Sequence, residues 1–353
     1  MTAMKGGMLG RHMRLLGVQF APLRVPLERR LQTLAASLWF ITFGFGNIIA
    51  GLVVLAILLY SYYLRWLLLP YLAWVWYDKD ICERGGRRNM STRSFIGWRY
   101  FREYFPLRLE KTVDLTPDRN YLFCVFPHGV LSAGAFGQFG NEFAPFRDMF
   151  PGLEPYVHTL HIHFITPFFR ELVLGLGGCS ASSKSINWVL GAPGVGRAGI
   201  LIVGGAAESL HCRPGVYRVI LSRRKGFVKI ALKNGTPLVP VFSFGETNLY
   251  DQMHNPEGSL LRRFQEFVRR KTTVAPVIPI GRGYFQYSFG LVPRRSLVTT
   301  VVGPPVEVPK ISDPTNEDVD KYHKLFQDSL TTLFEENKHK YIPNADNTFL
   351  EIE

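Results

Sequence analysis

A long stretch near the start of the chain carries apolar side chains with almost no interruption. No charged residue occurs between Gln32 and Leu64, and the sequence is again apolar and aromatic as far as Tyr77. Crossing a bilayer takes about 20 apolar residues, so this stretch is long enough for two passes. A polar break near its middle predicts two helices, over 33–56 and 60–77, forming a hairpin that crosses or re-enters a membrane.

The hairpin divides the chain into three predicted parts: a basic segment at 1–30, the hairpin at 31–77 and a domain at 78–353. A secretory signal peptide fits poorly, because the apolar run begins past residue 30 and lacks a small-residue cleavage site. Basic residues flank the hairpin on both sides, which predicts that both termini are cytosolic. They are Lys5, Arg11, Arg14, Arg24, Arg29 and Arg30 before it, and Lys79, Arg84, Arg87, Arg88 and Arg93 after it.

Beyond residue 120, short apolar runs alternate with helix-like stretches punctuated by glycine and proline. Such alternation predicts an α/β domain with a largely parallel or mixed sheet. A GxGxxG sequence at 194–199 precedes a strand instead of following one, so it predicts a loop and not a dinucleotide site. The strand candidates are 121–126, 199–203, 238–244, 274–280 and 298–302, and the helix candidates are 227–233 and 315–338.

A stretch of alternating basic and aromatic residues, Trp98 to Pro106, follows the hairpin. It predicts an amphipathic helix, for which two positions are equally compatible with the sequence. The helix either lies on the membrane surface or caps the core of the domain.

The overall charge points to anionic partners. The 353 residues carry a formal net charge of +13, and 47% of them are hydrophobic. This balance favours anionic lipid headgroups or phosphorylated cofactors. Nucleic acid is not expected, because neither zinc-finger spacing nor an RNA-recognition aromatic pattern occurs. The four cysteines form no CxxC pair, which argues against a disulfide framework or a structural zinc.

Three histidines, His158, His161 and His163, form an HxxHxH cluster. On a strand, the last two would share one face and could ligate a metal ion. No acidic or cysteine partner lies nearby in the sequence. We therefore expect no metal, and favour the wall of a substrate tunnel or an amphipathic segment.

The candidate chemistry begins at the end of the strand at 121–126, where the chain reads Phe126-Pro127-His128-Gly129. A histidine on a fixed turn at the end of a strand can direct its imidazole into a cleft. Imidazole is also the side chain best suited to accept a proton near neutral pH. His128 is therefore the predicted catalytic base, on a turn shaped by Pro127 and Gly129.

A second strand leads into a similar turn about 80 residues later. Gly204 and Gly205 are followed by two alanines and Glu208, and these small residues permit close approach of the backbone. Glu208 could orient or stabilise the imidazole, or it could be a carboxylate at the start of a helix. Glu142, in a nearer acidic stretch, competes for the role of partner to His128.

A basic cluster could bind phosphates, since guanidinium groups pair with them bidentately. Together with Arg282, the cluster could hold a nucleotide-like carrier, and the alternative is a solvated or lipid-facing surface. Its members are Arg218, Arg223, Arg224, Lys225 and Lys229.

Taken together, these motifs resemble the type-2 diacylglycerol acyltransferase family, in order, from about residue 35 to 353. The resemblance implies a membrane-anchored acyltransferase domain that esterifies diacylglycerol to triacylglycerol in the endoplasmic reticulum membrane, with lipid droplets as a second location. The matching segments are Trp98–Arg102, Pro127–Gly129, Gly204–Ser209, Arg224–Lys229, Leu238–Pro240, Phe242–Glu246, Gly281–Gly283, Gly290–Pro293 and Thr299–Gly303.

The resemblance implies that His128 is catalytic, and the motifs suggest a role for each of the other candidate residues. His128 would take the proton of the acceptor hydroxyl, and Glu208 would orient the imidazole. Acyl-CoA is the co-substrate, and neither a metal nor a further cofactor is expected. Pro127, Gly129, Gly204 and Gly205 would form the active-site turns, with N–H groups near Gly129 stabilising an oxyanion, and Arg224, Lys225 and Arg282 would bind the phosphates of CoA.

Two positions depart from family patterns. Phe126 stands where the family has the first histidine of His-Pro-His-Gly, which argues that this histidine is not needed for proton transfer. Ala133 stands where broader glycerolipid acyltransferases have an aspartate, so the partner of His128 must come from elsewhere in the chain.

Several alternatives stay open at the level of the sequence. The acceptor could be monoacylglycerol or a long-chain alcohol, and the chain could act as a monomer or as a homo-oligomer. A non-catalytic membrane or droplet protein that binds lipid would need only the hairpin and its basic flanks. A lipid hydrolase is not supported, because no GxSxG motif occurs.

Overall fold

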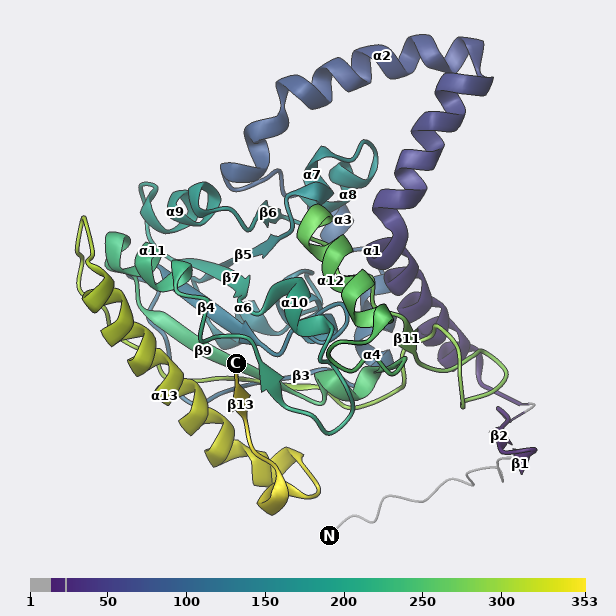
Figure 1. Cartoon of the computed structure of the whole chain (residues 1–353). Coiled ribbons are helices and arrows are strands. Elements are labelled where there is room, and N and C mark those ends of the chain that lie inside the picture. The colour runs from purple at the N-terminus through teal and green to yellow at the C-terminus, as the bar shows by residue number, and fades with distance from the viewer. Residues whose placement is uncertain (1–13, 23) are drawn as a thin grey trace.

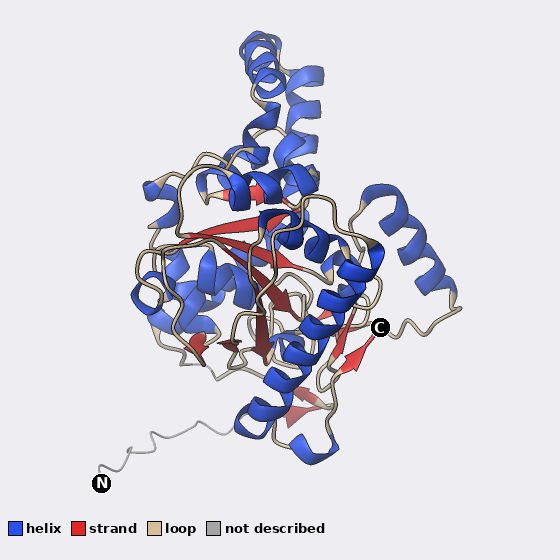
Figure 2. Cartoon of the chain, turned by 90° about the vertical axis from the view of Figure 1, so that its left-hand side faces the viewer, coloured by secondary structure: helices blue, strands red, loops and turns tan. Residues whose placement is uncertain are grey.

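A seven-stranded sheet with helices on both faces forms the centre of the molecule (Figures 1 and 2). The computed structural model describes residues 14–22 and 24–353, so Lys5 and Arg11 of the predicted basic segment lie outside the described residues. Neighbouring strands are parallel except where β12 meets β9, which confirms the predicted α/β class with a mixed sheet. In spatial order the strands are β3 (Arg108–Lys111), β12 (Thr299–Val302), β9 (Leu238–Phe244), β4 (Tyr121–Phe126), β7 (Arg197–Ile202), β5 (Glu154–Thr159) and β6 (Gly178–Ser180).

Strand β4 is buried along its whole length, because both faces of the sheet are covered. Successive side chains of a strand point to opposite faces, so the two sets enter different hydrophobic clusters. Tyr121, Phe123 and Val125 pack with α5 (Ala133–Phe139) and α6 (Phe146–Met149), whereas Leu122, Cys124 and Phe126 pack with α9 (Ser183–Gly191), α11 (Gly226–Asn234) and α13 (Asn316–Tyr341).

The two predicted helices of the domain are confirmed, although α13 continues to Tyr341, beyond the predicted end at 338. Helix α11 ends at Gly235, whose φ of +65° is the left-handed conformation that suits glycine at a helix terminus. Helix α13 begins after Thr315, which forms a capping box with Asp318.

The predicted strand at 274–280 is mostly wrong. Only β11 (Pro279–Ile280) is a strand there, and it pairs with β10 (Asp251–Gln252) outside the main sheet. The loop predicted for the GxGxxG sequence at 194–199 is confirmed only for 194–196, because β7 begins at Arg197.

Two helices occupy the predicted hairpin and project from one end of the domain (Figure 1). Helix α1 (Leu27–Tyr60) starts before the predicted boundary, and α2 (Tyr62–Tyr77) follows it after Ser61. Among the described residues, only α1 is both long and apolar enough to span a membrane. The position of the pair in a bilayer therefore stays a prediction.

Helix α4 (Gly97–Tyr104) resolves the two alternatives for the basic-aromatic stretch. Its Trp98, Phe101 and Tyr104 side chains are buried against α1, with the rings of Phe101 and Trp39 4.9 Å apart. The structure therefore supports the second alternative, in which α4 caps the core.

Short elements complete the chain. They are α3 (Met90–Arg93), α7 (Ile162–Ile165), α8 (Phe169–Gly175), α10 (Gly205–Ser209), α12 (Leu260–Thr272), the strand pairs β1 (Arg14–Leu15) with β2 (Val18–Gln19) and β8 (Arg218–Val219) with β13 (Glu351–Ile352), and 3₁₀ turns at Lys79–Glu83, Glu246–Leu249 and Ala345–Asn347.

Candidate active site

Three candidate residues follow the carboxyl ends of three neighbouring parallel strands. His128 follows β4, Glu208 follows β7 and Glu246 follows β9. The order of these strands in the sheet is β9, β4, β7, so His128 lies on the central strand, between the two carboxylates. Ligands of open α/β sheets bind outside this edge.

The imidazole of His128 is held by its Nδ1 atom. Nδ1 lies 3.2 Å from the carbonyl oxygen of Gly129 and 3.0 Å from the Oγ atom of Ser209. A carbonyl oxygen can only accept, so we assign the proton to Nδ1. The Nε2 atom then carries a free lone pair, and it has no hydrogen-bond partner among residues 14–22 and 24–353.

Burial lowers the pKa of His128 to about 4, with hydrogen bonds to the backbone opposing the shift. The imidazole is therefore neutral near pH 7. A neutral ring with a free Nε2 is the form that can accept a proton.

The structure brings Glu208 to the His128 turn, but its contact is with the main chain and not with the imidazole. Its carboxylate accepts hydrogen bonds from the N–H of His128 at 2.5 Å and of Ile220 at 2.9 Å. The side chain is buried, which raises the pKa of Glu208 to about 7 despite these two donors. Glycine is required at Gly204, because a Cβ atom there would overlap this carboxylate.

A second buried carboxylate, Glu246, was given no role by the sequence. It accepts hydrogen bonds from the N–H of Ala133 at 2.8 Å and of Gly134 at 2.7 Å, at the start of α5. Burial raises the pKa of Glu246 to about 7. Glu246 also borders the turn itself, since a Cβ atom on Gly129 would lie 2.7 Å from its Oε1 atom.

The sequence contained the information to find Glu246. Phe244-Gly245-Glu246 repeats the order of a buried strand, glycine and then glutamate that identified Glu208. The equivalence becomes visible once β9 and β7 are known to flank β4.

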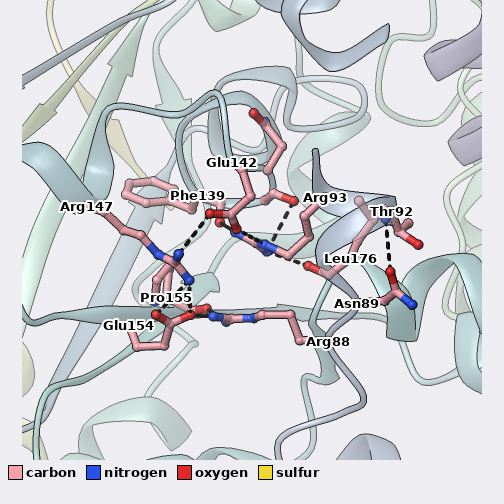
Figure 3. Close-up of polar contacts among 12 residues, drawn as sticks. Arg88, Asn89, Thr92, Arg93, Phe139, Glu142, Arg147, Glu154, Pro155 and Leu176 are labelled. Atoms are coloured by element: carbon pink, nitrogen blue, oxygen red, sulfur yellow. Dashed lines mark hydrogen bonds and ion pairs between the residues drawn. The ribbon is translucent and has the colours of Figure 1, made fainter. Parts of the chain in front are cut away.

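The alternative prediction, that Glu142 is the partner of His128, is wrong. Its carboxylate binds the guanidinium groups of Arg93 and Arg147, the latter at 2.9 Å (Figure 3). Arg147 also binds Glu154, so Glu142 belongs to an ion-pair network that ties β5 to the neighbouring loops.

Phe126 faces the hydrophobic core and not the imidazole. It is fully buried in the cluster that includes α11 and α13, with its ring 6.3 Å from that of Phe326. This explains how phenylalanine can occupy the first position of the tetrad in this chain.

The three predicted phosphate-binding residues do not lie together. The Nη2 atom of Arg224 is 3.4 Å from the carbonyl oxygen of Gly204, beside the site. Lys225 forms an ion pair with Asp320 on α13. Arg282 lies at the base of α1, where it bonds Thr33 and lies over the ring of Tyr104.

A hollow of about 520 Å³ lies between α10 and α12, and it is lined by Arg223 and by four arginines of α12. Ala207 and Ile220 form part of its wall, and they are the neighbour and a hydrogen-bond partner of Glu208. The hollow is therefore adjacent to the carboxylate that holds the His128 turn. Its arginines are Arg223, Arg262, Arg263, Arg269 and Arg270, and its glutamates are Glu257, Glu266 and Glu353.

The histidine cluster does not form one face of a strand. His158 lies in β5 and bonds the carbonyl oxygen of Ser180, whereas His161 precedes α7 and His163 lies within it. His163 bonds the side chain of Asn47 in α1, with the two nitrogen atoms 2.8 Å apart. Within the part of the chain that the structure describes, no three potential metal ligands come together.

The fold and the site define a mixed α/β protein in which a histidine lies on a turn beside two buried carboxylates. Sequence comparison identifies the family. The family model for diacylglycerol acyltransferase matches residues 57–352. The chain belongs to this family.

Named relatives fall into two groups. 2-Acylglycerol O-acyltransferase 1 of Bos taurus is 46% identical over 92% of this chain and 96% of that protein. Diacylglycerol O-acyltransferase 2 of Dictyostelium discoideum is 41% identical over 91% of this chain and 96% of that protein, and the human protein of that name is 40% identical over 90% and 82%. The solved structure of the LPA acyltransferase PlsC from Thermotoga maritima is 15% identical, with a TM-score of 0.37 over 87% of this chain and 97% of that chain.

Proposed function

We propose that this protein transfers an acyl group from acyl-CoA to the free hydroxyl of an acylglycerol, with diacylglycerol as acceptor and triacylglycerol as product. The observation that carries the proposal is the neutral imidazole of His128, with Nε2 free, at the edge of the sheet. Membership of the diacylglycerol acyltransferase family supports it.

In the proposed reaction His128 acts as general base. Its Nε2 atom takes the hydroxyl proton of the acceptor while the oxygen attacks the carbonyl carbon of the thioester. The tetrahedral intermediate collapses with cleavage of the C–S bond, and the thiolate of CoA leaves with the proton from the imidazolium. The thioester is already activated, so no covalent acyl-enzyme is needed.

Donors for the developing oxyanion are available on the same turn. The N–H groups of Gly129, Val130 and Leu131 have no acceptor among the described residues, whereas the N–H groups on either side of them are bound. Unpaired main-chain donors beside a base are the usual means of stabilising a tetrahedral intermediate. We assign Glu208 and Glu246 as positioning residues that hold this turn and the start of α5.

The phosphates of CoA fit the arginine-lined hollow. Arg224 lies beside Gly204, and Arg223 and Arg269 line the hollow nearby. Guanidinium groups bind phosphates bidentately. We therefore propose Arg223, Arg224 and Arg269 as the principal contacts. Arg223 and Arg269 pair with Glu353 and Glu266 inside the hollow and would exchange these carboxylates for phosphate, whereas Lys225 and Arg282 are bound to residues outside it.

The acceptor is proposed to arrive from the membrane along α1. The inner side of this helix packs on the site, with Gly44 next to Leu131 of the catalytic turn. Its other side exposes many large apolar residues, including Leu38, Ile48 and Leu52. A diacylglycerol that reaches the turn along α1 avoids exposing its acyl chains to water. We propose a multi-pass anchor in the endoplasmic reticulum with both termini cytosolic, and access to lipid droplets.

Monoacylglycerol is the second candidate acceptor, and one observation favours it. The relatives named 2-acylglycerol O-acyltransferase 1 are 42–46% identical to this chain, slightly more than the 40–42% of those named diacylglycerol O-acyltransferase 2.

The test measures acyl transfer from labelled oleoyl-CoA by membranes that contain the full chain. Diacylglycerol, monoacylglycerol and hexadecanol are supplied in parallel, and wild type is compared with His128→Ala. His254→Ala, at an exposed histidine remote from the turn in sequence, is the matched control. We expect triacylglycerol from wild type and the control, and a fall of about 10²–10⁴-fold in His128→Ala.

Each other outcome is informative. If product forms only from monoacylglycerol, the proposed acceptor is wrong but the proposed enzyme class stands. No product with any acceptor from a well-expressed wild type would contradict the proposal and favour a lipid-binding protein. Full activity in His128→Ala would remove the histidine from the mechanism.

A further inference from the structure

Helix α12 (Leu260–Thr272) is amphipathic in the reverse of the usual sense. A surface helix of a globular protein normally turns its apolar side to the core and its polar side to water. In α12 the buried side chains are Arg262 and Gln265, whereas Leu260, Phe264 and Phe267 are 83%, 59% and 61% exposed. The spacing of the exposed residues, i, i+4 and i+7, places them on one face.

Polar contacts hold the inner side of α12 to the domain. Arg262 donates to the carbonyl oxygen of Leu210 at 3.1 Å and lies 2.7 Å from the imidazole of His211. Gln265 donates to the carbonyl oxygen of Pro276 and accepts from Asn255 at 2.9 Å. These hydrogen bonds fix the rotation of the helix about its axis. The outward direction of the apolar face is therefore built into the fold.

Basic residues border the exposed apolar face. Arg263 and Arg270 lie along one side of it, and Lys271 lies at its C-terminal end, and all three are exposed. Glu266, the one acidic residue of the helix, faces inward and is neutralised by Arg262 and Arg269. The outer surface of α12 is therefore both apolar and positively charged.

We propose that α12 lies in the headgroup region of an anionic membrane surface, with Leu260, Phe264 and Phe267 inserted among the acyl chains. Helices that lie in the plane of the interface combine a bulky apolar face with flanking lysine and arginine. Arg263, Arg270 and Lys271 supply the charge that complements anionic headgroups. A protein partner would need a surface that is both apolar and negatively charged to match α12.

The proposal adds a second membrane contact to the one proposed for α1. Figure 1 shows α12 on the outside of the domain, with no element in front of it. Two separate contacts would fix the tilt of the domain against the bilayer better than one contact does. The hollow beside α12 would then open close to the membrane surface, where long-chain acyl-CoA collects.

The test places an environment-sensitive fluorophore on the helix in the full-length protein reconstituted in nanodiscs. Single substitutions Phe264→Cys and Phe267→Cys provide the attachment sites, and all four native cysteines are buried, so labelling is selective. Phe349→Cys is the matched control, because Phe349 is 67% exposed but lies beside Lys338 of α13. Quenchers attached to the lipid acyl chains report whether the fluorophore contacts lipid.

We expect emission from positions 264 and 267 to shift to shorter wavelength and to be quenched by the lipid-attached quencher, and position 349 to show neither. The effect should be larger in phosphatidylserine than in phosphatidylcholine nanodiscs. Arg263→Gln combined with Lys271→Gln should reduce that difference.

Three outcomes would overturn the proposal. Labels at 264 and 267 could be as water-exposed as the label at 349. They could shift without quenching by lipid, which would mean that protein covers the face. The chain could also fail to associate with the bilayer at all.

Discussion

The role of Glu208 as a positioning residue can be tested by Glu208→Gln. The two carboxylate oxygens accept from the N–H groups of His128 and Ile220, at 2.5 and 2.9 Å. Glutamine keeps the shape of the side chain but has one oxygen and one NH₂ group. One of the two main-chain donors must therefore face another donor in a buried site.

The expected magnitude follows from that mismatch. An unsatisfied buried donor costs about 1–3 kcal/mol, and the turn can escape this cost by moving away from the new side-chain amide. A displacement that removes the same free energy from the transition state lowers kcat by about 5- to 150-fold. The KM for acyl-CoA should change little, because the arginines of the hollow are untouched.

Thermal stability should respond differently from activity. Burial raises the pKa of Glu208 to about 7, so wild type loses folding stability as the pH rises from the ordinary pKa of a glutamate, 4.5, to that value. Glutamine avoids this loss, which is on the order of 3 kcal/mol at most. The stability regained in this way offsets the stability lost with the hydrogen bond. We therefore expect a small change in Tm beside a large fall in kcat.

The assay compares kcat, KM and Tm of wild type and Glu208→Gln at pH 7.5, with oleoyl-CoA and diacylglycerol. Asp328→Asn is the control, because Asp328 is an exposed residue on α13 that pairs only with Lys324 among the described residues. A wild-type kcat in Glu208→Gln would refute the positioning role. Parallel losses of Tm and kcat would assign Glu208 to stability alone.

Two further predictions concern the same turn. Glu246→Gln should gain stability relative to wild type as the pH rises from 5 to 8. The reason is that folded wild type, in which the pKa of Glu246 is raised to about 7, keeps a proton that the unfolded chain, with a pKa near 4.5, releases. Unfolding curves of both proteins at several pH values test this prediction. A difference in unfolding free energy that does not change with pH would contradict it. Gly129→Ala should lose most activity, because the new Cβ atom would lie 2.7 Å from the Glu246 side chain. The φ of +61° at Gly129 adds left-handed strain, which alone costs about 1–2 kcal/mol. Gly226→Ala, where a Cβ meets nothing within 4 Å, is its control in the same transfer assay, and equal activities would refute the steric argument.

The elements that could be predicted from the sequence are those whose own side chains decide them. Strands β4 and β9 are buried throughout and read as continuous apolar runs. Helix α13 carries its own capping box. Strand β5 was missed because it contains glutamate, proline and histidine and is stabilised by pairing with β6 and β7.

Amphipathic helices show the limit of sequence reasoning most directly. Both α4 and α12 carry aromatic and basic residues. Only the stretch that forms α4 is predicted to be an amphipathic helix, and its sequence does not indicate what covers the apolar face. Helix α1 covers α4 through Trp39, whereas nothing among the described residues covers Phe264 or Phe267 of α12.

The candidate site divides in the same way. His128 was recognisable because a strand, a turn and a histidine are contiguous. Two further features depend on the order β9, β4, β7 in the sheet: the hydrogen bond of Glu208 to the main chain of His128, and the position of Glu246 beside the same turn. The arginines of the hollow come from residues 223–270 and meet only because α12 folds back beside α10.

The use of both buried carboxylates on main-chain N–H groups has a consequence for the proposed reaction. Neither Glu208 nor Glu246 bonds the imidazole, so neither carboxylate would stabilise an imidazolium on His128 by a direct hydrogen bond, and burial keeps the pKa of His128 near 4. A proton taken from the acceptor hydroxyl is therefore held only briefly. The thiolate of CoA, whose pKa lies near the 8.5 of an ordinary thiol, is a much stronger base than this imidazole. Proton transfer from His128 to the leaving thiolate is thus strongly downhill, and it couples deprotonation of the alcohol to cleavage of the C–S bond without a stable charged intermediate on the enzyme.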